Sequence, residues 1–221
     1  MHVMVVNTKA YREGMGNEAI KIAKIMEKVG KETGIRMIIA VQHADVHRVA
    51  SNVEIDVFAQ HIDAIEYGSH TGWILAEGLK EAGAGGSIIN HSEHPVTINE
   101  IKRSVEILRK NKMESIVCAS DNEIAKSVAV FQPDYVAVEP PELIGGDISV
   151  TKAKPSVVKN AVESVRKVSN SAVLCGAGIK NGEDVRKAIE LGSSGILVAS
   201  GVVKAKNKEK IIMEMASAMV E

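Results

Sequence analysis

Three ionisable side chains of different chemistry stand where short apolar runs of the chain end. Lys9 follows the first such run, His91 follows a middle one, and Glu139 ends a later one. A cation, an imidazole and a carboxylate that face one space can move protons on a charged small molecule. The elements that carry these residues decide whether they face one space.

Eight short apolar runs along the chain are typical of β-strands. Most are continuous rather than alternating, as in Met37-Ile38-Ile39-Ala40-Val41, which favours parallel strands covered on both faces. The predicted strands are Val3–Val6, Arg36–Val41, Ile55–Gln60, Ser87–Asn90, Ser115–Ala119, Tyr135–Glu139, Ala172–Gly176 and Gly195–Ser200.

Amphipathic stretches with helical spacing separate most of these runs. The predicted helices are Asn17–Lys31, Asn99–Lys110, Glu123–Val130, Pro155–Val168, Glu183–Leu191 and Lys206–Met219. Ser92 and Asp121 are predicted N-caps, and Gly192 is a predicted helix stop. Eight strand–helix units of about 27 residues each predict a parallel sheet closed into a (β/α)8 barrel, with residues 1–221 in a single domain.

The composition restricts the classes of function. The formal net charge of -1 argues against a general nucleic-acid binder, and 3% aromatic residues offer no stacking platform for single strands. No apolar run approaches the length of a membrane span. Cys118 and Cys175 show neither a disulfide framework nor a zinc spacing. These observations predict a cytoplasmic protein with no nucleic-acid or membrane partner.

Glu139 is the predicted base. The carboxyl ends of barrel strands meet at one rim, and Pro140 and Pro141 restrict the backbone of the glutamate that precedes them. A carboxylate at the edge of an apolar barrel is partly desolvated, which raises its proton affinity toward that of a useful base. The alternative is a solvated carboxylate at the rim with a rigid turn after it.

His91 and Lys9 are the predicted partners of that base. His91 precedes a helix that starts near Thr97 or earlier, and an imidazole facing a helix N-terminus is pushed toward its neutral form. Lys9 would project into the barrel mouth with Glu93 as a natural partner, and Asn7 faces the same side of the strand. The alternatives are a histidine bonded to a backbone carbonyl and a lysine that points into water.

Two glycine-containing loops end the last two predicted strands. Gly176 and Gly178 lie in the first loop, and Ser200 and Gly201 lie in the second. Phosphate sites of barrel proteins often use these two loops, because bare backbone N–H groups can reach an anion there. The alternative is that the glycines only permit tight turns.

Four other features carry weaker signals. His43 and His47 have the spacing of a helical metal pair but no evident third ligand, which favours solvent-facing histidines and no metal. Cys118 has no activating partner that the sequence reveals, and we interpret it as a small buried apolar residue. The unpatterned stretches His61–Thr71 and Pro140–Lys154 are candidates for a lid or a subunit contact.

Seven segments, in order along the chain, resemble triosephosphate isomerase in its short archaeal form. They are Asn7-Thr8-Lys9-Ala10-Tyr11, Ala59-Gln60-His61-Ile62-Asp63, Gly68-Ser69-His70-Thr71-Gly72, Asn90-His91-Ser92-Glu93, Val138-Glu139-Pro140-Pro141-Glu142-Leu143-Ile144-Gly145, Cys175-Gly176-Ala177-Gly178-Ile179 and Leu197-Val198-Ala199-Ser200-Gly201. The resemblance covers nearly the whole chain and implies a TIM barrel. The segments are specific together, whereas the glycine loops alone are not.

The resemblance implies an enzyme that interconverts dihydroxyacetone phosphate and D-glyceraldehyde 3-phosphate in glycolysis and gluconeogenesis, without cofactor or metal. It makes Glu139 the base that carries a proton between two carbons and His91 the group that polarises the carbonyl. Lys9, with Asn7 beside it, is the electrostatic partner of the substrate, and Glu93 supports the site from behind. The pairing of a glutamate base with a neutral histidine is described for triosephosphate isomerase itself, so it belongs to the resemblance.

The resemblance also implies substrate contacts, a closing loop at Pro140–Lys154 and a homotetramer, with a dimer as the alternative. The implied substrate-binding residues are Asn7, Lys9, Ile144, Gly145, Gly146, Gly176, Gly178, Ala199, Ser200 and Gly201. The chain departs from the family pattern at Thr8, where an aromatic residue is usual, and at Asp147 in the closing loop. His94 is also unusual and is given no role.

Two other functions compete with the isomerase. One is another phosphate-binding barrel enzyme, such as a synthase acting on a phosphorylated precursor, which would keep the glycine loops without requiring Lys9, His91 and Glu139 together. The other is a barrel without catalysis that serves as a binding or assembly module. The presence of all three residues disfavours the second.

Overall fold

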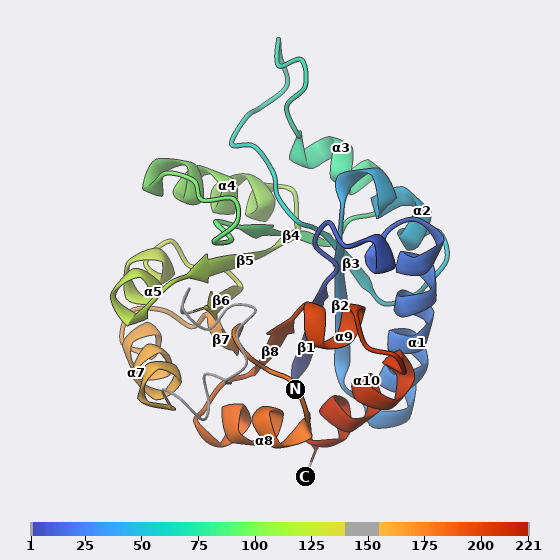
Figure 1. The fold of residues 1–221 in the computed structure, drawn as a ribbon. Helices are drawn as coiled ribbons and strands as arrows, with labels where there is room; N and C mark the ends of the chain where they lie inside the picture. Colours follow the sequence, from blue (N-terminus) through green and yellow to red (C-terminus); the bar gives the residue numbers. More distant parts are fainter. Residues whose placement is uncertain (1, 140–154, 221) are drawn as a thin grey trace.

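Eight parallel strands close into a barrel in the computed structural model, which describes residues 2–139 and 155–220 (Figure 1). Neighbouring strands pair in chain order, and β8 pairs back onto β1. The strands are β1 (Val3–Asn7), β2 (Arg36–Val41), β3 (Asp56–Ala59), β4 (Gly86–Ile89), β5 (Glu114–Ala119), β6 (Tyr135–Val138), β7 (Ala172–Cys175) and β8 (Gly195–Val198). The predicted (β/α)8 barrel is confirmed, and each predicted strand overlaps an observed one.

Most helices form a ring outside the barrel, whereas the short helix α9 lies inside that ring, at the barrel mouth (Figure 1). The helices are α1 (Asn17–Thr33), α2 (Val46–Ala50), α3 (Ala76–Glu81), α4 (Ile98–Lys110), α5 (Asn122–Ala129), α7 (Pro155–Arg166), α8 (Gly182–Glu190), α9 (Ser200–Val203) and α10 (Lys208–Ser217), with 3-10 turns η1 (Arg12–Gly14) and η2 (His43–Asp45). The helices α2, α3 and α9 were not predicted, because helices of 5, 6 and 4 residues are too short to show an amphipathic pattern in the sequence. Within the described ranges, no helix has the length and apolar content needed to cross a bilayer.

The helix ends correct one prediction and confirm two others. Ser92 is not an N-cap, because α4 begins later, after Thr97, whose hydroxyl accepts from the Glu100 N–H in a reciprocal capping box. Asp121 does cap α5, since its carboxylate accepts from the first backbone N–H groups of that helix. Gly192 lies just after α8 with a φ of 96°, as expected for a helix stop.

Inward-facing side chains fill the barrel and lead up to its mouth. The buried interior cluster consists of Val3, Val5, Ile38, Ala40, Phe58, Ile88, Ile116, Cys118, Ala137, Leu174 and Leu197. Because side chains alternate along a strand, the next inward position after Val5 is Asn7, and the next after Ala137 is Glu139. The polar residues at the mouth therefore continue the rows that form the apolar interior.

The opposite end of the barrel is closed by an ion network around Arg36. Its guanidinium donates to Asp56 at 2.8 Å, to Glu114 at 3.1 Å and to the Tyr135 hydroxyl at 2.7 Å. These four groups come from β2, β3, β5 and β6, at the ends where those strands begin. Polar side chains thus pair with one another at that end.

The segment between β3 and α3 projects away from the barrel axis rather than over the mouth (Figure 1). Its base is closed by Asp63, whose N–H donates to the Ile74 carbonyl at 3.0 Å and whose carboxylate accepts from the Ile74 N–H at 2.6 Å. Beyond that base, Tyr67 is 76% exposed and Trp73 is 56% exposed. This segment therefore does not cover the mouth as a lid would (Figure 1).

Candidate active site

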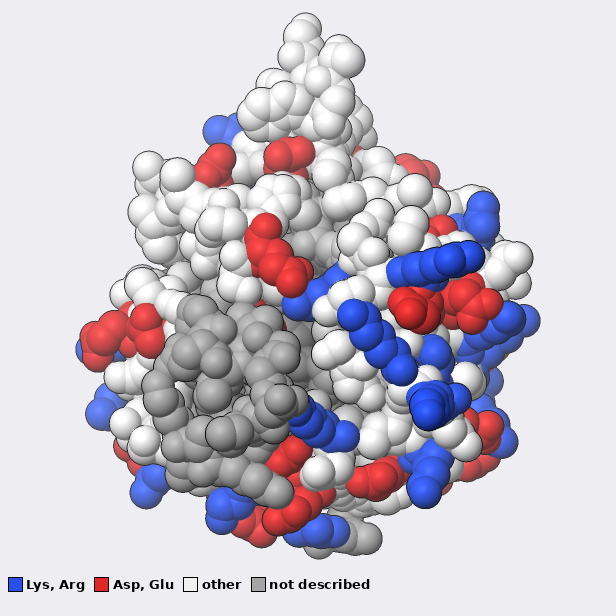
Figure 2. Space-filling model, in the orientation of Figure 1, with Lys and Arg blue, Asp and Glu red and all other residues white. Residues whose placement is uncertain are grey.

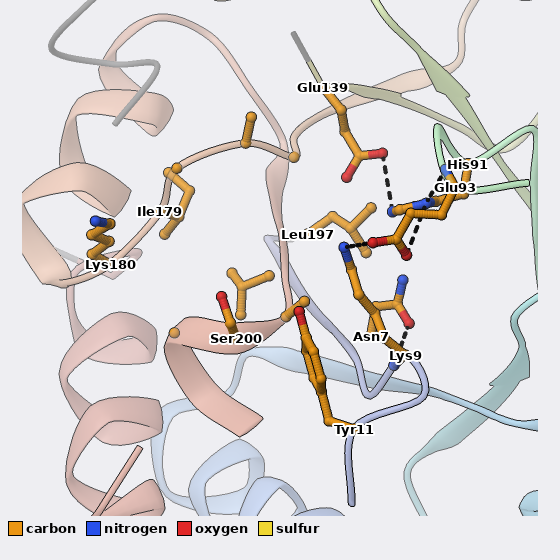
Figure 3. A pocket seen from close by; sticks show the side chains of 16 residues that line it. Asn7, Lys9, Tyr11, His91, Glu93, Glu139, Ile179, Lys180, Leu197 and Ser200 are labelled. Atoms are coloured by element: carbon orange, nitrogen blue, oxygen red, sulfur yellow. Dashed lines mark hydrogen bonds and ion pairs between the residues drawn. The ribbon is translucent and has the colours of Figure 1, made fainter. Parts of the chain in front are cut away.

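A cavity of about 440 Å³ opens at the carboxyl ends of the strands and contains Lys9, His91 and Glu139 (Figure 3). Its wall comes from the loops after β1, β4, β6, β7 and β8. The other lining residues are Asn7, Tyr11, Glu93, Gly176, Ala177, Gly178, Ile179, Lys180, Leu197, Val198, Ala199, Ser200 and Gly201. This size suits a small-molecule ligand.

Lys9 enters the cavity on a constrained backbone. Its φ is 49°, in the left-handed region that a residue with a Cβ rarely adopts. The Lys9 N–H donates to Asn7 Oδ1 at 2.9 Å, and the Lys9 carbonyl accepts from Gln60 Nε2 at 3.1 Å. The ammonium donates to Glu93 Oε1 at 2.8 Å, and the lysine side chain is only 11% exposed. Lys9 is therefore paired with Glu93 and does not point into water.

His91 is buried, and its surroundings set both its tautomer and its charge. The backbone N–H of Glu93 donates to His91 Nδ1 at 3.1 Å, so a neutral ring carries its proton on Nε2. Burial lowers the pKa of His91, the Lys9 charge lowers it further, and Glu93 opposes both. The prediction that a helix N-terminus keeps His91 neutral is wrong, because α4 starts only at Ile98. Burial is the main cause that favours the neutral imidazole.

Glu139 is 5% exposed and lies across the cavity from Lys9 (Figure 3). Its Oε2 is 3.5 Å from His91 Nε2, which is longer than an ordinary hydrogen bond, and has no hydrogen-bond partner among the described residues. Burial raises the pKa of Glu139 to about 7, while Cys118 and Lys9 act against that rise. The alternative of a solvated rim carboxylate is wrong, and the buried group has the proton affinity of a general base at neutral pH.

Cys118 contacts the site, although its sequence context predicted only a small buried apolar residue. Its side chain is buried on β5, and its thiol is hydrogen-bonded to the Glu139 carboxylate. The strand register explains this contact. Cys118 of β5 pairs with Ala137 of β6, and Glu139 is the next inward-facing position after Ala137. A strand register inferred from the inward rows of β5 and β6 would have revealed it.

The glycine loops leave room for the groups around them. A Cβ on Gly176 would overlap the Glu139 side chain, so a glycine is required there if the carboxylate is to keep its position. Gly178 has a φ of 67°, which favours glycine for the backbone itself. Ala199, Ser200 and Gly201 line the same side of the cavity, although Ser200 begins α9 rather than ending a strand. Their binding of phosphate stays a prediction.

The structure does not describe every residue that the resemblance implies for the site. Ile144, Gly145, Gly146 and Asp147, with the rest of Pro140–Lys154, fall outside the described residues. Among the described residues no group of three or more His, Cys, Asp or Glu side chains could hold a metal ion.

The two histidines with metal-pair spacing, His43 and His47, lie in different helical segments. His47 is exposed on α2, as predicted. His43 lies in η2, where its Nε2 is 2.8 Å from the carbonyl of His61, so the prediction that it faces solvent is wrong.

Basic side chains gather on one part of this face, over η1, α1 and α10 (Figure 2). The Lys204 ammonium lies 4.1 Å from the centre of the Tyr11 ring, and Tyr11 lines the cavity. Such a cation over an aromatic face is held electrostatically. The side of the mouth next to β1 and β8 is therefore suited to an anionic ligand.

Comparisons with known proteins agree with this geometry. The profile of the family described as "Triosephosphate isomerase" matches residues 2–215. The chain belongs to the triosephosphate isomerase family. A triosephosphate isomerase of Methanothermus fervidus is 50% identical over 218 residues, covering 98% of each chain. That of Sulfolobus acidocaldarius is 47% identical over 210 residues, covering 95% of this chain and 91% of the relative.

A solved structure shares the fold. The triosephosphate isomerase of Bartonella henselae superposes with a TM-score of 0.78 at 16% identity, over 100% of this chain and 99% of that one. At that identity the likeness concerns the barrel alone. Membership of the triosephosphate isomerase family rests on the profile and the archaeal relatives, and it makes the chain an isomerase.

Proposed function

We propose that this chain interconverts dihydroxyacetone phosphate and D-glyceraldehyde 3-phosphate, with Glu139, His91 and Lys9 as its catalytic residues. The observation that carries the proposal is the meeting of a buried carboxylate, a neutral imidazole and a paired ammonium in one cavity. The family acts on triose phosphates, and the cavity size suits such a molecule. The reaction needs neither cofactor nor metal, because it only moves protons between neighbouring atoms.

In the first half of the reaction Glu139 removes a proton from C1 of dihydroxyacetone phosphate. The electron pair of the broken C–H bond forms a C1–C2 double bond, and the carbonyl oxygen on C2 becomes negative. The Nε2–H of His91 donates to that oxygen, and the Lys9 ammonium stabilises its charge. Fixed donors of this kind are worth about 3 kcal/mol each in a site that excludes water.

In the second half, protons move between the two oxygens and Glu139 returns its proton to C2. The product is D-glyceraldehyde 3-phosphate, and the carboxylate is regenerated. A base whose pKa lies near 7 suits both halves, because it must first accept the proton and later release it. Cys118 donates to the same carboxylate, which keeps the ionised form available despite burial.

The phosphate group is assigned to the side of the cavity formed by Gly176, Gly178, Ala199, Ser200 and Gly201. These residues line the cavity beside Lys204 and Tyr11, next to the basic part of the face. Backbone N–H groups of glycine-containing loops can approach an anion closely. Asn7 and Lys9 complete the proposed substrate site on one side, and Ile144, Gly145 and Gly146 do so by resemblance.

A coupled assay with each triose phosphate tests the reaction directly. We expect turnover in both directions with no added metal, and the same rate after treatment with a chelator. A synthase would show no interconversion of the two sugars, and a binding module would bind them without turnover. Either result would overturn the proposal.

We also propose that the protein is a homo-oligomer, a tetramer by resemblance with a dimer as the alternative. Two separate sets of exposed apolar side chains support two interfaces. Tyr67 and Trp73 lie on the projecting segment, whereas Ile98, Ile124 and Val130 lie on or just after α4 and α5. Closed assemblies with two kinds of interface are typically tetramers with twofold symmetry.

Light scattering on the purified protein should give about four times the mass of 23.6 kDa. Replacing Ile124 by Lys should then yield dimers, since a charge on an apolar interface is left unpaired, and the matched exposed change Lys126→Ala should not. A monomer for the unaltered protein would refute the proposed assembly.

A cytoplasmic location in glycolysis and gluconeogenesis is proposed on two grounds. Cys118 and Cys175 are free and buried, which suits a reducing compartment. The substrates of the family are phosphorylated sugars, which carry charge and do not cross membranes unaided. Cell fractionation followed by the isomerase assay tests this location, and recovery of the activity outside the cytoplasm would contradict it.

A further inference from the structure

Two histidines outside the catalytic trio stack on each other, and one of them lies in the turn that carries His91. The rings of His61 and His94 have centroids 4.0 Å apart and planes 20° apart. His61 comes from the base of the projecting segment after β3, and His94 comes from the turn after β4 that carries His91. The stack therefore joins two loops that are distant in sequence.

The His94 side of the stack is attached directly to the catalytic turn. The His94 N–H donates to the His91 carbonyl at 2.7 Å, which closes a tight turn of four residues. Within that turn the Glu93 N–H bonds His91 Nδ1, and the Glu93 carboxylate bonds Lys9. A displacement of His94 would therefore move the groups that fix the His91 tautomer and the Lys9 ammonium.

The His61 side of the stack is attached to a rigid base. His61 is 5% exposed, and its carbonyl accepts from His43 Nε2 at 2.8 Å. Its own Nε2 lies 3.3 Å from Asp63 Oδ1, and Asp63 holds the base of the projecting segment through Ile74. His61 thus offers a fixed surface against which the exposed His94 ring can rest.

We propose that His61 and His94 are positioning residues whose stack holds the catalytic turn in place, and that acid releases the turn when both rings become charged. Parallel rings at this separation attract each other while neutral. Two imidazolium rings at the same distance would repel. The kinetic consequence rests on the proposed isomerase activity, whereas the stack itself does not.

The charged groups around the stack determine the direction of its pH dependence. Asp63 favours a charged His61, whereas His94 and His43 disfavour it, and Glu100 of α4 lies near enough to feel the His61 charge. Burial is the largest effect and lowers the pKa of His61. A released ring regains the ordinary histidine pKa of about 6.5, so the stacked arrangement is present above that pH and is lost as the pH falls through the lowered pKa.

Kinetics of two His94 variants test the positioning role. His94→Ala removes the stack and should lower kcat about tenfold with KM within about twofold, because the catalytic turn loses its support. His94→Phe keeps an aromatic ring on His61 and should retain at least about half of kcat. His47→Ala, an exposed histidine on α2, is the matched control and should match the unaltered protein. Equal kcat for His94→Ala and the control would overturn the proposal, as would equal losses in the Ala and Phe variants.

The pH dependence provides a second kinetic test. Below about pH 6, log(kcat/KM) of the unaltered protein should fall with a slope greater than 1 per pH unit, the slope that a single protonation gives. The same plot for His94→Phe should have a slope of about 1. Identical slopes would exclude release by acid.

Histidine ring resonances in an NMR titration test the stack without any activity. We expect His61 to titrate below the ordinary range in the unaltered protein and closer to it in His94→Ala. If no triose phosphate is turned over but these titrations behave as expected, the proposed function fails while the stack stands. If His61 titrates identically in both proteins, the stack is refuted whatever the activity.

Discussion

Replacing Glu139 by Gln should lower kcat by about 10²- to 10⁴-fold, the range typical of a lost general base. Glutamine keeps the shape of the side chain and can still accept from the Cys118 thiol, but it cannot take a proton. Affinity for a non-reacting substrate analogue should stay within about twofold, because the phosphate loops are untouched. Steady-state kinetics and analogue titration measure the two effects.

Glu139→Asp is the matched variant, since aspartate retains the carboxylate on a shorter side chain. The carboxylate then lies farther from the substrate carbon whose proton it must remove. Its turnover should also fall severely, because proton transfer requires contact distance. Loss of analogue binding with turnover per bound substrate preserved would contradict the assignment of Glu139 as the base.

The raised pKa of Glu139 gives that substitution a second expected effect, on stability. The ordinary pKa of 4.5 applies to the unfolded chain, and burial raises it to about 7 in the fold. Above pH 7 the fold must therefore keep a buried carboxylate ionised, at a cost of about 3 kcal/mol. This cost develops as the pH rises from 4.5 to about 7 and is absent in acid.

Glu139→Gln should accordingly be more stable than the unaltered protein at pH 8, and the difference should vanish near pH 4. Urea unfolding at the two pH values measures it. An unchanged or reduced stability at pH 8 would show that the carboxylate is better solvated than its burial indicates. Such a variant would gain stability and lose activity together, because the buried ionised carboxylate destabilises the fold but is required for catalysis.

The barrel could be predicted from the sequence because each of its layers leaves a pattern. Strands covered on both faces are continuous apolar runs, and α1 or α4 are long enough to show an apolar stripe. The shorter helices α2 and α3 were not predicted, since five or six residues do not complete two turns. The misplaced cap was avoidable, because Thr97 and Glu100 form a capping box that is legible in the sequence.

The site could be predicted only as far as position along the chain determines position in space. Lys9, His91 and Glu139 all follow strands, so the fold alone brings them to one rim. Their ionisation could not be predicted in the same way, because burial of His91 and Glu139 depends on the packing of several loops. The contacts of Cys118 and Gln60 likewise depend on strand register and loop shape, which no local pattern records.

Replacing Lys9 by Ala should lower kcat/KM by at least about 10³-fold, because the site loses the cation that stabilises charge on both the substrate and the reacting oxygen. Lys9 is also one of the charges that lower the pKa of His91, and Glu93 raises it. Without the ammonium, the unpaired Glu93 carboxylate would favour a charged His91. The proposed role of His91 requires the neutral ring, so its charging would reduce activity further. Steady-state kinetics and an NMR titration of His91 measure the two consequences.

The backbone of Lys9 requires a matched variant, because its φ of 49° is strained for alanine and ordinary for glycine. Lys9→Gly removes the ammonium without that strain, so it should be as inactive as Lys9→Ala while unfolding at a higher denaturant concentration. Lys206→Ala, an exposed lysine outside the cavity lining, should retain full activity. Activity recovered in Lys9→Gly would mean that backbone shape, rather than charge, is what Lys9 supplies. Near-normal kinetics in both variants would remove Lys9 from the mechanism, since an ammonium held 2.8 Å from Glu93 would then serve the fold alone.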